Sequence, residues 1–169
     1  MILVAVGANL PSRFGTPLDA CESAVQALEG RGIRIVARSR WWESAPVPVS
    51  DQPWYVNGVV AVETVLSAAA LLAELHAVEE AMGRVRTVPN APRVIDLDLL
   101  AYDNQVLDSG PALVPHPRMA GRAFVVLPLA EVAPGWRHPV TGQTVRAMVD
   151  ALPADQEIRP AKERPKEPD

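Results

Sequence analysis

Lysine is almost missing from this 169-residue chain: only Lys162 and Lys166 occur, both close to the end of the sequence. An anion held by the body of the protein is therefore expected to meet arginine, whose planar guanidinium pairs with phosphate through two hydrogen bonds. A general bias in composition explains the same scarcity equally well. The formal net charge of −4 argues against the broad basic field that bulk nucleic-acid binding requires.

Cysteine and long apolar runs are scarce as well. Cys21 is the only cysteine, so an internal disulfide and a cysteine-based metal cluster are excluded. Residues 1–6 are apolar but lack the basic region of a secretory signal. No run reaches the ~20 apolar residues that a membrane helix needs. We therefore expect a cytoplasmic protein with no membrane partner.

The hydrophobic pattern predicts strands and helices in alternation. We expect strands over residues 2–7, 33–42, 55–64 and 94–102, and helices over residues 17–29, 68–82, 122–132 and 145–151. Thr16 followed by Pro17 is a typical helix start. In the second strand, Ile33, Ile35 and Ala37 are expected to share one face.

The order of these elements predicts the fold class. Because the second and third strands follow each other directly, the order is β-α-β-β-α-β with a helical C-terminal extension. It indicates an α+β, ferredoxin-like sandwich, with helices on one sheet face and the active site on the other. The length suggests one domain over residues 1–152. Residues 153–169 are charged and rich in proline, so we expect a disordered tail there.

Two acids interrupt the apolar run of the last expected strand. Asp96 and Asp98 are two residues apart, so a strand turns both side chains to one face. Adjacent carboxylates repel unless a proton or a cation neutralises them. Mg²⁺ suits such a pair, because it takes one or two carboxylates together with waters and substrate phosphates. The sequence thus predicts a metal site at these acids; the alternative is a solvated face on an edge strand.

Three arginines lie just before this strand. Arg84, Arg86 and Arg93 are expected to contact phosphate, since bidentate arginine–phosphate pairs are strong and directional; surface ion pairs are the alternative. The sequence has no Gly-x-x-x-x-Gly-Lys loop, so a nucleotide would bind in another manner. Phosphoryl or pyrophosphoryl transfer from a nucleotide is the working hypothesis.

An aromatic residue and an amide fall on one face of the third strand. Tyr55 could stack on a flat heterocycle and Asn57 could hydrogen-bond its edge, although both could simply pack in the core. His116 stands between two prolines, where it could contact a nucleotide or only pack.

These features together resemble the 6-hydroxymethyl-7,8-dihydropterin pyrophosphokinase family of folate biosynthesis. The resemblance rests on blocks at residues 7–10, 51–57, 83–86, 92–100, 114–119 and 122–129. The most specific block is 92–100, which contains both acids. The resemblance implies transfer of the β,γ-diphosphate of ATP to the hydroxymethyl group of the pterin, with release of AMP.

The resemblance also implies roles for individual residues. The expected pterin contacts are Ser44, Ala45, Pro46, Val47, Tyr55, Asn57 and Phe124. The expected ATP contacts are Glu79, Arg84, Arg86, Arg93, His116 and Arg122. Asp96 and Asp98 would bind two Mg²⁺ ions, and these acids with Arg84 and Arg93 would be the catalytic residues. The partners are then ATP and the pterin, without nucleic acid, and the chain is expected to be a monomer.

Some positions depart from the family pattern. Ala45 and Pro117 replace a frequent proline and tyrosine, and the loop over residues 87–92 is short. We therefore expect that loop to move less than its longer counterparts. Two rival classes remain open: another Mg²⁺-dependent nucleotidyl- or glycosyltransferase, and a ferredoxin-like RNA-binding module. Paired aspartates on the sheet face argue against the second rival.

Overall fold

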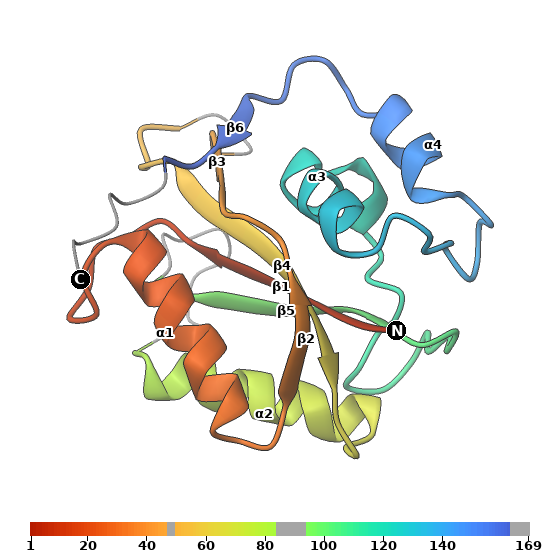
Figure 1. Cartoon of the computed structure of the whole chain (residues 1–169), viewed down its shortest axis with the longest axis horizontal. Coiled ribbons are helices and arrows are strands. Elements are labelled where there is room, and N and C mark those ends of the chain that lie inside the picture. The colour runs from red at the N-terminus through yellow and green to blue at the C-terminus, as the bar shows by residue number, and fades with distance from the viewer. Residues whose placement is uncertain (47–49, 84–93, 163–169) are drawn as a thin grey trace.

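The computed structural model describes residues 1–46, 50–83 and 94–162 (Figure 1). The strands are β1 (Ile2–Ala8), β2 (Arg34–Arg38), β3 (Trp42–Ser44), β4 (Tyr55–Glu63), β5 (Asp96–Tyr102) and β6 (Ile158–Pro160). The helices are α1 (Pro17–Glu29), α2 (Ala68–Ala81), the 3₁₀ turn η1 (Met119–Gly121), α3 (Ala123–Val132) and α4 (Val145–Asp150). The chain is thus a mixed α/β protein, with helices and strands close to the predicted ranges.

All strand pairings in the sheet are antiparallel. The order is β5-β1-β4-β3-β6, and β2 pairs with β4 beyond the end of β3. In the middle of the sheet, Gly7 of β1 lies opposite Asp96 of β5 on one side and Asn57 of β4 on the other. This register brings an acid and an amide that are 39 positions apart in the sequence into one row across the sheet.

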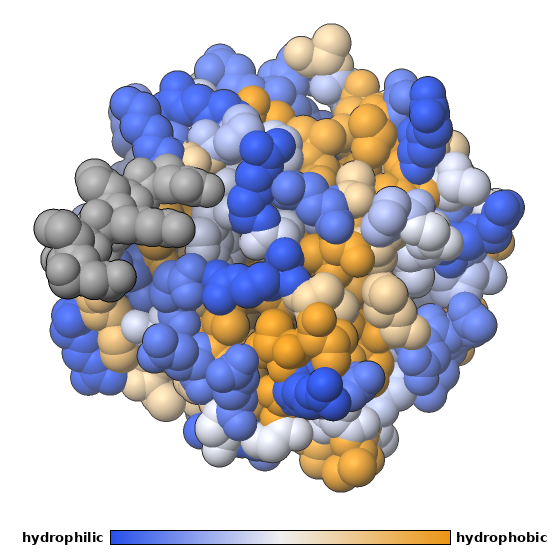
Figure 2. Space-filling view, in the orientation of Figure 1, coloured by the Kyte–Doolittle hydropathy of each residue, from blue (hydrophilic) through white to orange (hydrophobic). Residues whose placement is uncertain are grey.

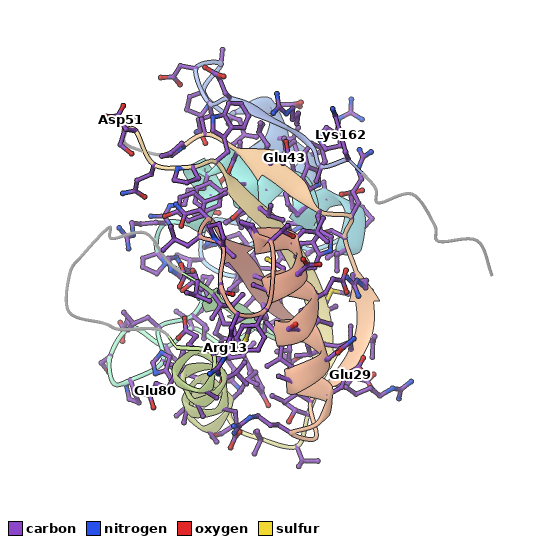
Figure 3. The ribbon with its side chains drawn as sticks, turned by 90° about the vertical axis from the view of Figure 1, so that its left-hand side faces the viewer. Arg13, Glu29, Glu43, Asp51, Glu80 and Lys162 are labelled. Atoms are coloured by element: carbon purple, nitrogen blue, oxygen red, sulfur yellow. The ribbon has the colours of Figure 1, made fainter. Side chains whose placement is uncertain are left out.

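Helices α1 and α2 lie together against one face of the sheet (Figure 1). α1 begins as the sequence predicts: the Thr16 hydroxyl accepts a hydrogen bond from Asp19 N–H, and the Asp19 carboxylate accepts one from Thr16 N–H. This reciprocal cap satisfies helix donors that would otherwise be unpaired. At the C-terminal end of α2, the Arg13 guanidinium donates a hydrogen bond to the Ala81 carbonyl over 2.8 Å (Figure 3).

The second face of the sheet is also covered, by α3, with α4 packed against α3 (Figure 1), so the prediction of helices on one face only is wrong. Leu3, Val59 and Leu100 form a separate apolar cluster with Val125 and Leu129 of α3. The reason lies in β4, which is buried along most of its length on both faces. A strand with apolar side chains on both faces must be covered on both.

The predicted strand over residues 33–42 is divided into β2 and β3 by an irregular segment, and β2 itself contains a bulge. The register with β4 shifts between Ile35 and Ala37. Ile35 therefore packs against the apolar cluster that the sheet forms with α1 and α2, and Ala37 packs against the cluster with α3. Val36 between them is 43% exposed. The expectation that Ile35 and Ala37 share a face is wrong, because one extra residue reverses the alternation.

The predicted disordered tail also needs correction over residues 153–162. Residues 158–160 form β6, which pairs with β3. The Arg159 guanidinium lies 3.0 Å from the Glu43 carboxylate of β3, and Figure 3 shows Glu43 at the same end of the molecule as Lys162. Composition alone predicted no structure here, because a short edge strand gains its hydrogen bonds only from a distant partner.

On the face that Figure 2 presents, hydrophilic side chains surround and interrupt an apolar area that runs through the middle. Within the part of the chain that the structure describes, none of the helices is long and apolar enough to cross a membrane.

Candidate active site

A cavity of about 500 Å³ opens on the second face of the sheet, beside the N-terminus of α3. It brings together residues that the sequence assigned to separate roles. Its lining includes the predicted residues Ser44, Ala45, Pro46, Tyr55, Asn57, Asp96, Asp98, His116, Arg122 and Phe124. These residues come from β3, β4, β5, α3 and the connecting loops, so the cavity depends on the tertiary fold.

Asp96 and Asp98 lie side by side on β5, and both side chains are half-buried in the cavity wall. The alternation of the strand turns Leu97 and Leu99 into the opposite core. Their partners on β1 are small: Gly7 lies opposite Asp96, and Ala5 lies opposite Asp98. Ala5 and Gly7 also line the cavity. Small residues beside the acids leave open the space that larger side chains would fill.

Glu79 occupies a different position from the one expected. Its side chain is fully buried, at 0% exposure, and its carboxylate accepts a hydrogen bond from the Leu97 N–H over 3.0 Å. Because Leu97 separates the two aspartates, this bond fixes the backbone that carries them. Glu79 does not line the cavity, and its side chain lies buried against β5.

Asn57 is held at the floor of the cavity. Its side-chain amide donates to the Ser44 hydroxyl over 2.7 Å, and both residues are buried, at 6% and 4% exposure. Gly7 makes room for this arrangement, because a Cβ atom at that position would lie 2.8 Å from the Asn57 side-chain oxygen. The row of Asp96, Gly7 and Asn57 is therefore tightly constrained.

Two aromatic rings reach the cavity from different elements. Tyr55 is the first residue of β4, and Phe124 lies in the first turn of α3. The Arg122 guanidinium carbon lies 5.4 Å from the centre of the Phe124 ring, within the range of a cation–π contact. A flat ligand and an anionic group could thus be bound at neighbouring points of one wall.

His116 is held at the edge of β5, where its backbone N–H donates a hydrogen bond to the Leu100 carbonyl over 2.8 Å. Its Nδ1 accepts from Arg118 N–H, so Nε2 carries the proton of the neutral ring. Burial lowers the pKa of His116, as do the charges of Arg122 and Arg118, while Asp96 acts in the opposite direction. At neutral pH this ring is an uncharged hydrogen-bond donor.

Four predicted site residues, Val47, Arg84, Arg86 and Arg93, lie outside the described residues. Conversely, the structure adds cavity residues that the sequence did not assign. These are Ala5, Val6, Gly7, Ser50, Gln52, Gly58, Arg118, Gly121, Pro153, Asp155 and Gln156. The small residues of β1 gave a usable signal, since Ala5 and Gly7 follow Leu3 on one face of the strand and leave space there. The residues after 152 gave none.

Two carboxylates are a donor set that fits Mg²⁺. Within residues 1–46, 50–83 and 94–162, no group of three or more His, Cys, Asp or Glu side chains could hold a metal ion. Asp96 and Asp98 alone would leave most coordination positions to water and phosphate, which is the manner in which Mg²⁺ is usually bound. Zinc would require more protein ligands.

The fold and the cavity together define a mixed α/β protein whose sheet carries a pocket lined by both polar and apolar residues, an arrangement typical of enzymes that act on small molecules. The sequence gives the particular family. Residues 3–134 match the model of the family described as 7,8-dihydro-6-hydroxymethylpterin-pyrophosphokinase (HPPK). The chain belongs to this family.

Individual relatives agree with this result. The chain is 40% identical to the 2-amino-4-hydroxy-6-hydroxymethyldihydropteridine pyrophosphokinase of Pseudomonas aeruginosa, over 90% of this chain and 91% of that enzyme. It is also 40% identical to the enzyme of the same name from Methylorubrum extorquens, over 85% of this chain and 90% of the other.

Other relatives are much longer. The chain is 35% identical to the folic acid synthesis protein fol1 of Pneumocystis carinii over 94% of its own length, but it spans only 21% of that protein. Among solved structures, wild-type HPPK-DHPS of Plasmodium falciparum with SDX-DHP superposes with a TM-score of 0.67 at 13% identity. That match covers 88% of this chain and 43% of the other, and it shows a shared fold.

Proposed function

We propose that this chain transfers the β,γ-diphosphate of ATP to 6-hydroxymethyl-7,8-dihydropterin in folate biosynthesis. The hydroxymethyl oxygen forms a bond to the β-phosphorus, the bond between that phosphorus and the α,β-bridging oxygen breaks, and AMP leaves. The hydroxyl proton passes to solvent. One observation carries the proposal: a single cavity contains two carboxylates beside Tyr55, Asn57 and Phe124. Membership of the family supports it.

The pterin half of the cavity is assigned to the β3–β4 wall and the start of α3. Tyr55 and Phe124 provide aromatic surfaces for the flat ring. Asn57 provides amide hydrogen bonds for its polar edge, and Ser44 keeps that amide in place. Ala45, Pro46 and Val47 complete this part of the assignment; Val47 is placed by sequence alone.

The ATP half is assigned to the cationic side of the cavity. Arg122 and neutral His116 donate hydrogen bonds to phosphate oxygens, with the His116 donor at Nε2. Arg84, Arg86 and Arg93 are assigned to the same phosphates from the sequence. Phosphoryl transfer depends mainly on positioning and on neutralising charge, and these are the tasks that arginines and a fixed imidazole can perform.

Asp96 and Asp98 are assigned as ligands of two Mg²⁺ ions. When bound, the ions would neutralise phosphate charge and orient the diphosphate toward the acceptor. The chain's own part is to hold both carboxylates on one face of β5. The hydrogen bond from the Leu97 N–H to the buried Glu79 carboxylate supports this arrangement.

The wider assignments follow the same reasoning. The strand order β5-β1-β4-β2, with α1 and α2 on one face, supports a ferredoxin-like core followed by a C-terminal extension. We assign residues 1–152 to the catalytic domain, and residues 153–162 add β6 to its sheet. We also infer a cytoplasmic monomer; light scattering of the purified chain would test its oligomeric state.

The decisive experiment incubates the chain with ATP, Mg²⁺ and the reduced hydroxymethylpterin, and follows the products by ³¹P NMR and chromatography. We expect AMP and the pterin diphosphate in equal amounts. Asp96→Asn and Asp98→Asn should each lower kcat by a factor on the order of 10² or more, as loss of a group that stabilises charge does. Asp108→Asn, in an exposed loop, is the matched control.

Other products would contradict the proposal. Pyrophosphate or a nucleoside diphosphate would indicate the rival class of transferases. Full activity in the Asp96→Asn and Asp98→Asn variants, with folding verified by circular dichroism, would remove the acids from the reaction. No turnover by the wild-type chain would reject the pyrophosphokinase itself.

A further inference from the structure

The segment after α4 passes over the cavity before it joins the sheet. Figure 1 shows it leaving α4, running above α3 and ending as β6 beside β3. Three of its residues, Pro153, Asp155 and Gln156, line the cavity. We call residues 153–160 the C-terminal strap. It lies beyond residues 3–134, which match the family, so the family match assigns it no role.

Gln156 connects the strap to the start of α3 by two hydrogen bonds. Its side-chain oxygen accepts from Ala123 N–H over 2.9 Å, and its side-chain nitrogen donates to the Gly121 carbonyl over 2.8 Å. The carboxamide thus acts as a peptide group paired with the backbone on both sides of Arg122.

The start of α3 depends on such a partner. Arg122 is its N-cap residue, and its side chain makes no capping hydrogen bond. The first N–H groups of a helix have no partner within the helix. A Ser, Thr or Asp N-cap residue supplies a hydrogen-bond acceptor for these N–H groups locally. Here Gln156, 33 positions along the chain, supplies the acceptor for the Ala123 N–H.

The C-terminal end of the strap is hydrogen-bonded to the opposite wall of the cavity, at β3. The Glu157 carbonyl accepts from Ala45 N–H over 3.0 Å, and Ile158 lies opposite Ser44 in the β3–β6 pairing. Arg159 adds a contact with Glu43 and stacks 4.5 Å from the Trp54 ring. The two walls of the cavity are thus joined within a few residues of the strap.

We propose that Gln156 is a positioning residue, which holds Arg122 and Phe124 at the correct distance from the Ser44–Asn57 wall. The inference rests on the proposed function, which assigns these side chains to ATP and to the pterin. Fixing the start of α3 before the substrates arrive removes an ordering cost that binding would otherwise bear. Gln156 touches neither substrate in this role and acts through the backbone of residues 121–123.

The test replaces Gln156 with methionine, which is similar in size and can form neither hydrogen bond, and separately with alanine. We expect Kd of the pterin, titrated with a non-hydrolysable ATP analogue present, to rise about tenfold in both variants, the factor for losing roughly one net hydrogen bond. KM for the pterin should rise in parallel, with kcat changed by less than about twofold, since the reacting groups remain. Gln105→Met, on an exposed turn, is the matched control and should match the wild type.

Amide hydrogen exchange gives a readout that does not depend on turnover. The Ala123 amide should be protected in the wild type and exchange faster in Gln156→Met. An active wild type whose Gln156→Met variant keeps the same pterin Kd and KM overturns this inference alone, even if the free energy of unfolding has fallen. A wild type that forms no AMP overturns the proposed function, and this inference with it.

Discussion

The side-chain amide of Asn57 donates a hydrogen bond to the hydroxyl of Ser44 over 2.7 Å and joins β4 to β3 at the floor of the cavity. The two residues are 13 positions apart and lie next to each other only because their strands pair. An amide fixed in this way presents its remaining polar atoms in one orientation, which is what selective recognition of a heterocycle requires.

Ser44→Ala should therefore weaken both the fold and the binding of the pterin. Removal of the hydroxyl leaves a buried Asn57 N–H without this acceptor, at a cost of about 1–2 kcal/mol in the free energy of unfolding. KM for the pterin should rise, while KM for ATP stays near the wild-type value. Urea denaturation and steady-state kinetics measure the two effects. Ser109→Ala, on an exposed turn, should change neither, and an unchanged pterin KM in Ser44→Ala would remove this hydrogen bond from recognition.

Gly7→Ala should disturb the same site from the neighbouring strand. The new Cβ atom would lie 2.8 Å from the Asn57 side-chain oxygen, so the amide has to move. Crowding of this kind in a packed region costs about 1–3 kcal/mol of stability, and the affinity for the pterin should fall. Thermal unfolding and a pterin titration measure the outcome. The control is Gly135→Ala, where an added Cβ meets nothing within 4 Å; equal behaviour of the two variants would show that Asn57 can readjust freely.

Substitutions of Glu79 should separate the role of its carboxylate as a hydrogen-bond acceptor from that of its buried charge. Glu79→Leu leaves the buried Leu97 N–H without its acceptor and should cost about 2 kcal/mol of stability. The Mg²⁺ concentration for half-maximal activity should also rise, because the backbone between Asp96 and Asp98 is released. Glu79→Gln keeps an acceptor and should lose less of both.

The control for Glu79 is Glu80→Leu on the same helix, where the side chain is exposed (Figure 3). It should leave the Mg²⁺ dependence unchanged. If Glu79→Leu and Glu79→Gln shift the Mg²⁺ dependence equally, the hydrogen bond to Leu97 is not what positions the acids.

Glu22 should make a small contribution to stability that depends on pH. Burial by itself would raise the pKa of Glu22, but hydrogen bonds from Trp41 and Arg38 and the charge of Arg38 lower it below its ordinary value. A carboxyl with a lowered folded pKa stabilises the protein above its unfolded pKa, and this stability is lost as the pH falls through the folded pKa. Since 40% of the side chain is exposed, the contribution is about 0.5 kcal/mol.

Glu22→Gln should therefore reduce the free energy of unfolding at pH 7 and bring it closer to the wild-type value in acid, below the pKa of ~4.3 for an unfolded glutamate. Urea denaturation across this pH range measures the difference. Glu29→Gln, at the exposed end of the same helix (Figure 3), is the control. A constant difference between Glu22→Gln and wild type at all pH values would contradict the coupling to Arg38 and Trp41.

Much of the fold follows from local sequence patterns. The start of α1 at Thr16, the strands β1 and β4, and the shared face of Asp96 and Asp98 agree with prediction. Each depends on residues a few positions apart, where backbone geometry gives a fixed period. The family was also recognisable from its motifs, because the signature around the two acids is specific.

The errors arose where distant residues decide the outcome. The bulge at Val36 moved Ala37 to the other face through pairing with β4. The burial of Glu79 likewise depends on β5, whose Leu97 N–H donates a hydrogen bond to its carboxylate. Residues 153–162 looked like part of a tail, yet β3 and α3 give residues 156–160 partners.

The sequence by itself determined the pair of acids, the aromatic and amide positions beside them, and the family to which the chain belongs. Only the tertiary structure decided that α3 covers the second sheet face, that Gly7 separates Asp96 from Asn57, and that Gln156 supports the start of α3. Local periodicity is set by the geometry of neighbouring peptides. Burial and the pairing of strand edges depend on which distant segments meet, and that is settled only when the whole chain packs.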